Sequence, residues 1–93
     1  MATVEENKKR RHERFVLSRA MKYVSRLEGN DRLQQGYIIN ISEAGLCFVS
    51  KTAVSEGQEI GIRTELPFFH QKGVVVWSSK IDDSLYKAGL LCR

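Results

Sequence analysis

Residues 36–50 are GYIINISEAGLCFVS, two apolar stretches separated by a short polar segment. The stretches at residues 37–41 and 46–50 are rich in β-branched and aromatic side chains, which favour strands. Residues 42–45 predict a turn, because Ser and Gly are frequent in turns and Gly45 is free to adopt a positive φ. This part of the chain therefore predicts two antiparallel strands joined by a tight connection.

Further strands are expected towards the C-terminus, each bounded by turn residues. Turns are predicted at residues 55–57 and 82–84, and Pro67 should end a strand or lie at a sheet edge. The expected strands cover residues 59–66, 73–77 and 85–92. Frequent turns and the absence of a long helical period after residue 28 indicate an all-β domain, either an antiparallel sheet or a small barrel.

Residues 15–27 allow two interpretations. Apolar residues at Leu17, Met21 and Val24 fit one face of a helix, and this spacing alone slightly favours a helix. A Gly-Asn turn at residues 29–30, with a strand pattern beyond it, instead favours a strand over residues 20–27 as the first arm of a hairpin. We expect the strand, with the helix as the alternative.

The chain has 93 residues, enough for one domain. No apolar run approaches the roughly 20 residues that a membrane-spanning helix needs, and no secretory signal is visible. Cys47 and Cys92 are expected to be reduced and buried. These features predict a cytoplasmic protein that does not insert into a membrane. A metal site is not expected, because the cysteines and histidines lack the spacing of zinc ligands.

The net charge is concentrated near the N-terminus. Residues 8–14, KKRRHER, hold five basic residues and one acidic residue, so they carry the whole net charge of +4. The ten basic and ten acidic residues elsewhere cancel. We therefore expect a flexible basic arm at residues 1–14, followed by a neutral β-domain at residues 15–93.

Catalysis is not expected. His12 lies in the charged arm and His70 in a predicted loop, so both should be exposed, and neither accompanies a recognisable Ser or Cys nucleophile. The glycine motifs of phosphate loops and dinucleotide folds do not occur. Asp82 and Asp83 are adjacent, which suits a turn better than a carboxylate pair. The sequence thus predicts neither an enzyme nor a cofactor.

The basic arm is the first candidate binding element. Arg10 and Arg14 are four residues apart, with Lys8, Lys9 and Arg11 beside them. An arginine side chain donates two hydrogen bonds to guanine O6 and N7, stacks on bases and pairs with phosphate. By itself, such an arm is more often a solvated tail or a non-specific nucleic-acid contact.

A second polar element lies at the end of the strand predicted at residues 37–41. Asn40 and Ser42 flank Ile41, so on a strand they would face the same side. The Asn40 amide can accept hydrogen bonds from guanine N1 and N2, and the Ser42 hydroxyl can donate to phosphate. Alternatively, both side chains only satisfy backbone groups of a tight turn. Paired with the basic arm, this element predicts a site for a small anionic guanine nucleotide.

The order of these elements resembles the PilZ family of bacterial cyclic di-GMP receptors. An Arg-x-x-x-Arg motif at residues 10–14 precedes an Asn-x-Ser-x-x-Gly motif at residues 40–45. Residues 73–77, GVVVW, resemble the family's Gly-x-Val-x-Trp strand. Residues 86–91, YKAGLL, resemble its closing Tyr-x-x-Gly strand. The likeness covers residues 9–92, almost the whole chain.

The resemblance implies a six-stranded antiparallel β-barrel with the arm lying across its mouth, and cyclic di-GMP as the ligand. Arg10 and Arg14 would grip guanine edges and phosphates. Asn40 would contact the Watson–Crick edge of a guanine, and Ser42 would bind phosphate or base. Gly45 would shape the turn.

The resemblance also implies secondary contacts. Lys9 occupies the position before the first motif arginine, which is thought to bias family members between one ligand and a stacked pair. Lys9 and Arg11 are therefore expected as possible additional ligand contacts.

The expected mechanism is a switch without a chemical step. Ligand binding would fold the arm over the barrel and change the surface offered to a downstream protein partner. Two alternatives remain: a small barrel whose arm binds single-stranded nucleic acid, which the neutral body disfavours, and a PilZ-like adaptor that binds no ligand.

Overall fold

Alternating apolar side chains produce six strands in the computed structural model, which describes residues 13–25 and 32–92. The strands are β1 (Phe15–Ser25), β2 (Leu33–Ile41), β3 (Gly45–Ser50), β4 (Glu59–Ile62), β5 (Lys72–Asp82) and β6 (Leu85–Cys92). A single 3-10 turn, η1 (Pro67–Phe69), interrupts the connection between β4 and β5. The all-β prediction is therefore confirmed.

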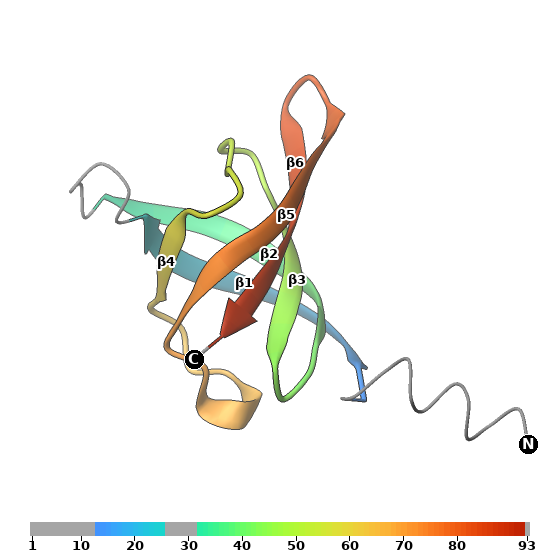
Figure 1. Ribbon diagram of the computed structural model, residues 1–93, viewed down its shortest axis with the longest axis vertical. Coiled ribbons are helices and arrows are strands. Elements are labelled where there is room, and N and C mark those ends of the chain that lie inside the picture. The colour runs from blue at the N-terminus through green and yellow to red at the C-terminus, as the bar shows by residue number, and fades with distance from the viewer. Residues whose placement is uncertain (1–12, 26–31, 93) are drawn as a thin grey trace, which may run out of the picture.

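The six strands form one closed barrel in the order β1-β2-β3-β6-β5-β4 (Figure 1). Every neighbouring pair is antiparallel. The ring closes between β1 and β4, where Tyr23 pairs with Ile62 and Ser25 with Ile60. This arrangement confirms the barrel that the family resemblance implied.

The barrel encloses an apolar core that holds the strands together. Tyr23 and Phe48 pack edge to face with ring centroids 5.5 Å apart, a favourable geometry for aromatic pairs. The hydroxyl groups of Tyr23 and Ser50 are 2.7 Å apart and hydrogen-bonded, which satisfies both buried polar groups. Burial raises the pKa of Tyr23 above its ordinary value.

Strand β1 resolves the ambiguity of residues 15–27 in favour of the strand for the residues that the structure describes. Met21 and Tyr23 are buried, whereas Lys22 between them is exposed, which is the period of a strand. β1 pairs with β2 on one side and with β4 on the other. Backbone pairing on both edges outweighs the weak helical spacing of the side chains.

A bulge in β2 changes which residues face the core. Between Ile38 and Asn40 the register with β3 advances by two residues on β2 but by one on β3. Ile38 and Ile41 are consequently both buried, at 0% and 2% exposure. The extra residue shifts the in–out alternation of the side chains by one position, so Asn40 faces the outer surface just before the turn.

Two strand lengths differ from the prediction. β4 ends at Ile62 and not at residue 66, because the chain turns away: the backbone N–H of Lys22 donates to Thr64 Oγ1 at 2.8 Å in place of a strand carbonyl. β5 continues to Asp82, beyond the predicted residue 77, because its second half pairs with β6. In the described parts of the chain, no helix is long and apolar enough to cross a membrane.

Candidate functional site

The connection between β2 and β3, residues 42–45, is a tight turn closed by backbone hydrogen bonds between its first and last residues. The N–H of Ser42 donates to the carbonyl of Gly45 at 2.7 Å, and the N–H of Gly45 donates back at 3.3 Å. Ser42 Oγ accepts the N–H of Ala44 at 3.2 Å. The N–H of Cys92, at the end of β6, donates to the carbonyl of Ala44 at 2.8 Å. The loop is therefore fixed both internally and from the neighbouring strand.

Gly45 serves a different purpose from the one expected. Its φ is not positive, and Gly57 alone among the described glycines has a positive φ, of 90°. A Cβ atom at position 45 would instead overlap the backbone carbonyl oxygen of Leu90. Glycine is needed here because β3 approaches β6 too closely for any side chain.

A depression of about 150 Å³ lies beside this loop, on the outer surface of the barrel. The structure brings four of the predicted site residues to its wall: Arg14, Asn40, Ser42 and Gly45. Arg14 comes from the root of β1, and the others come from the end of β2 and the start of β3. The remaining predicted residues, Lys9, Arg10 and Arg11, lie outside the described residues.

Asn40 and Ser42 line the depression together, whereas Ile41 between them is buried in the core. The face that they share is thus the one expected from strand geometry. The Ser42 hydroxyl already bonds backbone groups of its own loop. It can therefore donate to a ligand only if its hydrogen turns away from the Gly45 carbonyl, 3.4 Å distant.

Another wall of the depression comes from β5 and β6, which the sequence does not identify as part of a site. Trp77 is 41% exposed and lies directly over Gly89, where a Cβ atom would overlap the indole ring. A bulge between Val75 and Trp77 sets the position of the indole. The family-like Gly-x-Val-x-Trp and Tyr-x-x-Gly patterns were the available signal, but they were interpreted only as strands.

The electrostatic character of the site is visible at Cys47. Burial raises the pKa of this thiol, while the nearby charges of Lys87 and Arg14 partly oppose the shift. Of these two cations, Arg14 lines the depression itself. A half-exposed indole, an amide and a guanidinium group together suit an anionic ligand with a planar ring. In the described segments, no three His, Cys, Asp or Glu side chains are placed to hold a metal ion.

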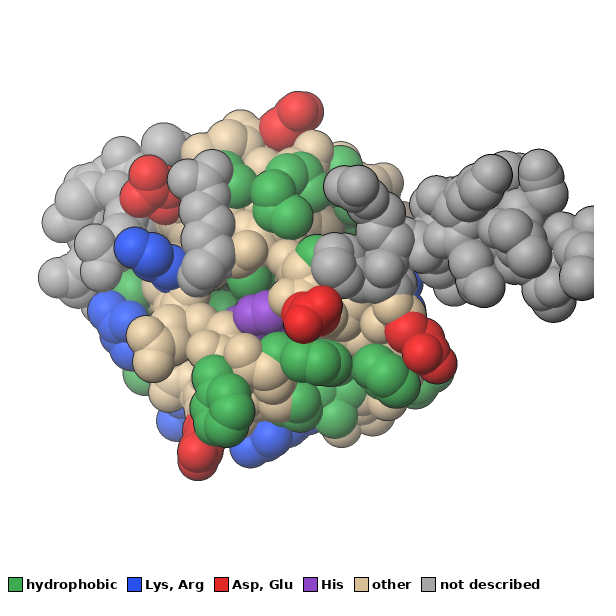
Figure 2. Space-filling view, turned by 60° about the horizontal axis from the view of Figure 1, so that its bottom comes forward, with side chains coloured by type: hydrophobic (Ala, Val, Ile, Leu, Met, Phe, Trp, Pro, Cys, Tyr) green, Lys and Arg blue, Asp and Glu red, His purple; other side chains and the backbone are tan. Residues whose placement is uncertain are grey.

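The prediction that His70 would be exposed is wrong. His70 is only 9% exposed, and its Nε2 is 2.8 Å from the carbonyl oxygen of Ser42. A carbonyl can only accept, so the imidazole must carry a proton on Nε2 and donate it. Figure 2 shows the purple imidazole in the middle of this end of the barrel, surrounded by other atoms. His70 therefore fixes the backbone of the β2–β3 loop from the β4–β5 connection. His12 lies outside the described residues.

Comparison with known proteins agrees with this geometry. The model of the PilZ domain family matches residues 8–92. A comparison with curated proteins gave no match. The matched range includes every strand of the barrel and both candidate binding motifs.

Proposed function

The chain belongs to the PilZ family, whose members are in general receptors for cyclic di-GMP rather than enzymes, and we propose from this premise that it binds cyclic di-GMP itself. The observation that carries the proposal is the shared depression. Arg14 precedes β1, whereas Asn40 and Ser42 end β2, yet all three line one hollow. A purely structural turn would not require a cation from another strand at the same place.

Each wall of the depression has a role in this proposal. Arg14 pairs with a phosphate or with the O6 and N7 atoms of guanine. Asn40 accepts from the Watson–Crick edge of a guanine, and Ser42 contacts phosphate or base. The exposed face of the Trp77 indole provides a surface on which a purine can stack. Cations and an aromatic face thus complement the charged and planar parts of the same ligand.

The size of the depression explains why an arm is needed. Its volume of about 150 Å³ is less than the ~300 Å³ at which pockets for whole small ligands begin. It therefore holds one base or phosphate and leaves the rest of a cyclic dinucleotide uncovered. In our proposal Arg10, with Lys9 and Arg11 as secondary contacts, closes over the exposed part. Ligand binding then changes the arrangement of the arm relative to the barrel.

The proposed output is a protein–protein contact, in a bacterial and cytoplasmic setting. An arm that closes over a ligand alters the surface next to it, and a downstream protein reads that change. The free energy of ligand binding must exceed the entropic cost of ordering the arm, roughly 1–2 kcal/mol per residue. Several charge-assisted hydrogen bonds, each stronger than a neutral one, supply it.

Isothermal calorimetry with cyclic di-GMP on the wild type and on Arg14→Ala tests the proposal. We expect Arg14→Ala to weaken binding by about 2 kcal/mol, or roughly thirtyfold, because charged hydrogen bonds carry much of the affinity. Arg14→Lys should lie between the two, since lysine keeps the charge but loses the planar fork.

Arg19→Ala is the matched control, because Arg19 is an exposed arginine on β1, five residues from Arg14, and does not line the depression. It should bind as tightly as the wild type. Equal affinities of wild type and Arg14→Ala, or no heat from either, would contradict the proposal. Salt-sensitive binding of single-stranded oligonucleotides instead would support the nucleic-acid alternative.

A further inference from the structure

The connection between β4 and β5 holds two phenylalanines in an unfavourable backbone conformation. Phe68 has φ 65° and Phe69 has φ 56°, and they are the only described residues other than glycine with a positive φ. Bulky side chains rarely adopt this region, because it brings their Cβ atoms too close to the backbone, and this is the cost of the conformation. A sequence with Gly or Asn at either position would avoid that cost.

The conformation persists because two backbone hydrogen bonds and one buried side chain hold the connection in place. The N–H of Ile62 donates to the carbonyl of Gln71 at 2.8 Å and closes the base of the loop. The N–H of Phe69 donates to the carbonyl of Leu66 at 3.0 Å, and the Leu66 side chain is buried in the core. The fold thus imposes the strain, and the result is that Phe69 projects with 79% of its surface exposed.

Phe68 contacts two residues, Phe15 and His70, that each adjoin a residue of the proposed nucleotide site. The ring centroids of Phe68 and Phe15 are 6.2 Å apart, and Phe15 directly follows Arg14. The ring of Phe68 also lies 5.9 Å from the ring of His70, whose Nε2 donates to the Ser42 carbonyl. A displacement of Arg14 or of the turn at Ser42 can therefore reach Phe68 through one intermediate residue, Phe15 or His70.

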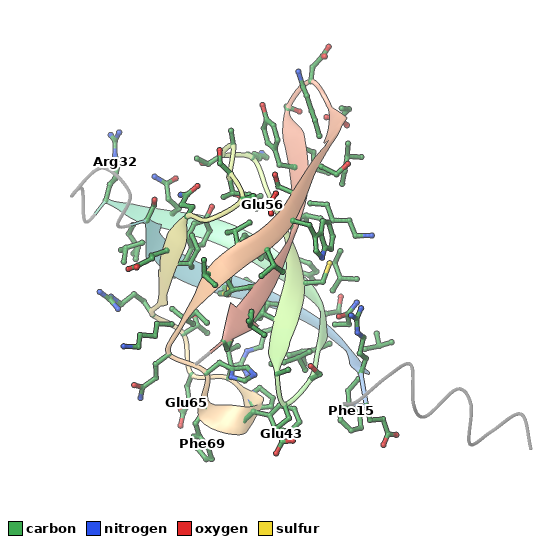
Figure 3. The ribbon with its side chains drawn as sticks, viewed as in Figure 1. Phe15, Arg32, Glu43, Glu56, Glu65 and Phe69 are labelled. Atoms are coloured by element: carbon green, nitrogen blue, oxygen red, sulfur yellow. The ribbon has the colours of Figure 1, made fainter. Side chains whose placement is uncertain are left out.

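The charges around the exposed rings indicate what the surface can bind. Figure 3 shows Glu43 and Glu65 at the same end of the barrel as Phe15 and Phe69. Both carboxylates are exposed and would repel an anionic lipid surface. Apolar rings beside carboxylates instead complement a protein surface with an apolar pocket and basic residues around it.

A neighbouring hollow adds basic side chains to the same surface. It has a volume of about 480 Å³ and is lined by Phe69 and Glu65 together with Arg63 and Lys72, both exposed. The surface around the rings is therefore of mixed charge, as is usual at the rim of a protein–protein contact.

We propose that Phe68 and Phe69, together with Phe15, form the surface through which this protein docks on its downstream partner, a protein with an apolar pocket rimmed by Lys or Arg side chains. The dependence of docking on ligand rests on the proposed cyclic di-GMP site. The aromatic rings are the anchors, because a solvent-exposed Phe that is already fixed loses little freedom on binding. Glu43 and Glu65 orient the partner.

Photo-crosslinking followed by binding measurements tests this inference. Para-benzoylphenylalanine is placed at position 69 and, as a matched control, at position 81, in bacterial cells that make cyclic di-GMP. Ile81 is an exposed apolar residue, at 50%, on the β5–β6 hairpin. We expect a partner protein to be captured from position 69 and not from position 81.

The captured protein is then purified and titrated against the full chain. Phe69→Ser should weaken its binding at least about tenfold, as for an interface anchor, whereas Ile81→Ser should change it by less than about twofold. Saturating cyclic di-GMP should change the affinity of the wild type, and Phe68→Ala should reduce that change. Equal binding of wild type and Phe69→Ser would overturn the inference.

Other outcomes also overturn it. Capture of nothing, of a second copy of this chain, or of the same protein from both positions would exclude the proposed surface. Phe69-dependent sedimentation with vesicles of phosphatidylcholine and phosphatidylglycerol would point to a membrane instead. Calorimetry with cyclic di-GMP on the wild type and on Phe69→Ser separates the two proposals. If both bind the ligand equally and docking does not depend on Phe69, only the docking surface is refuted. If the wild type binds no ligand, the receptor proposal is refuted.

Discussion

Two connections lie next to each other at one end of the barrel, and they obtain their shapes in opposite ways. The β2–β3 loop, residues 42–45, uses no positive φ and is held by hydrogen bonds from β6 and from His70. The β4–β5 connection, residues 63–71, contains two strained phenylalanines. The first resembles a preorganised binding element, and the second presents side chains to solvent at a cost in stability.

The difference fits the two roles that we propose for this end of the molecule, ligand binding and partner docking. A ligand is bound most tightly by groups that are already in place, which an unstrained and well-anchored turn provides. A surface that must respond to the ligand needs an arrangement that is not at its own energy minimum, so that a small change can shift it. His70 joins the two connections through one hydrogen bond.

The largest expected effect comes from Gly45→Ala. Its Cβ would overlap the Leu90 carbonyl oxygen, so β3 and β6 must separate, and the free energy of unfolding should fall by about 3 kcal/mol or more. Gly57→Ala is the control, because no atom lies near the added Cβ. Its only cost is the strain of an alanine at a positive φ, about 1 kcal/mol in unfolding free energy. Urea denaturation measures both. Similar costs would show that close packing is not what requires Gly45.

The link between the two connections is tested by His70→Ala. The variant removes the shorter of two hydrogen bonds to the Ser42 carbonyl, which keeps the Gly45 N–H at 3.3 Å, and should cost about 1.5 kcal/mol in unfolding free energy. His70→Gln can still donate from its amide and should lose less. If both variants unfold at the wild-type urea concentration, the hydrogen bond does not stabilise the turn.

A smaller effect concerns the anchor from β6. Burial raises the pKa of the Cys92 thiol to about 11, from an ordinary value of 9.0. The folded state therefore resists ionisation, and this contribution to stability is present below pH 9 and is lost as the pH rises from 9 to 11. Because the thiol is partly exposed, we expect a loss of about 1 kcal/mol.

Cys92→Ala should flatten the stability curve in that interval. Burial also raises the pKa of Tyr23, so its ionisation at alkaline pH destabilises the wild type and the variant equally. The difference between the two stability curves therefore isolates the contribution of the Cys92 thiol. Urea denaturation at several pH values provides the curves. Parallel curves for wild type and variant would mean that Cys92 ionises as easily in the folded chain as in the unfolded one.

The smallest expected effect is a gain. Asn tolerates a positive φ better than other residues with a side chain, so Phe69→Asn should be more stable than Phe69→Ala by about 0.5 kcal/mol. Phe69 is 79% exposed, so little packing is lost in either variant. Thermal denaturation compares them. If the alanine variant is as stable as the asparagine variant, the positive φ at position 69 does not destabilise the folded protein.

The sequence predicted the strands well, because their side chains alternate locally. β1 was the exception, since its spacing also fitted a helix until the pairing with β2 and β4 was considered. β4 was predicted too long because Ile60, Ile62 and Thr64 alternate, although the chain has already turned away at Thr64 to bond Lys22. Side-chain pattern alone does not contain that contact.

The site was predictable as a set of residues but not as a set of contacts. The motif residues Asn40, Ser42 and Gly45 line one depression together with Arg14, and their binding of a ligand stays a prediction. The reason for Gly45 was wrong because the strand that forbids a side chain there lies far along the sequence, at Leu90. His70 was expected to be exposed for the same reason: its partner is a carbonyl 28 residues away.

Trp77 has a practical consequence, because it is the only tryptophan in the chain and its indole lies over Gly89 at the wall of the depression. All indole fluorescence of the unlabelled protein therefore originates at the candidate site. A purine stacked on the ring would quench this emission directly, and a basic arm closing beside it would shift its wavelength. If the proposed ligand binds there, the molecule contains its own optical reporter of occupancy.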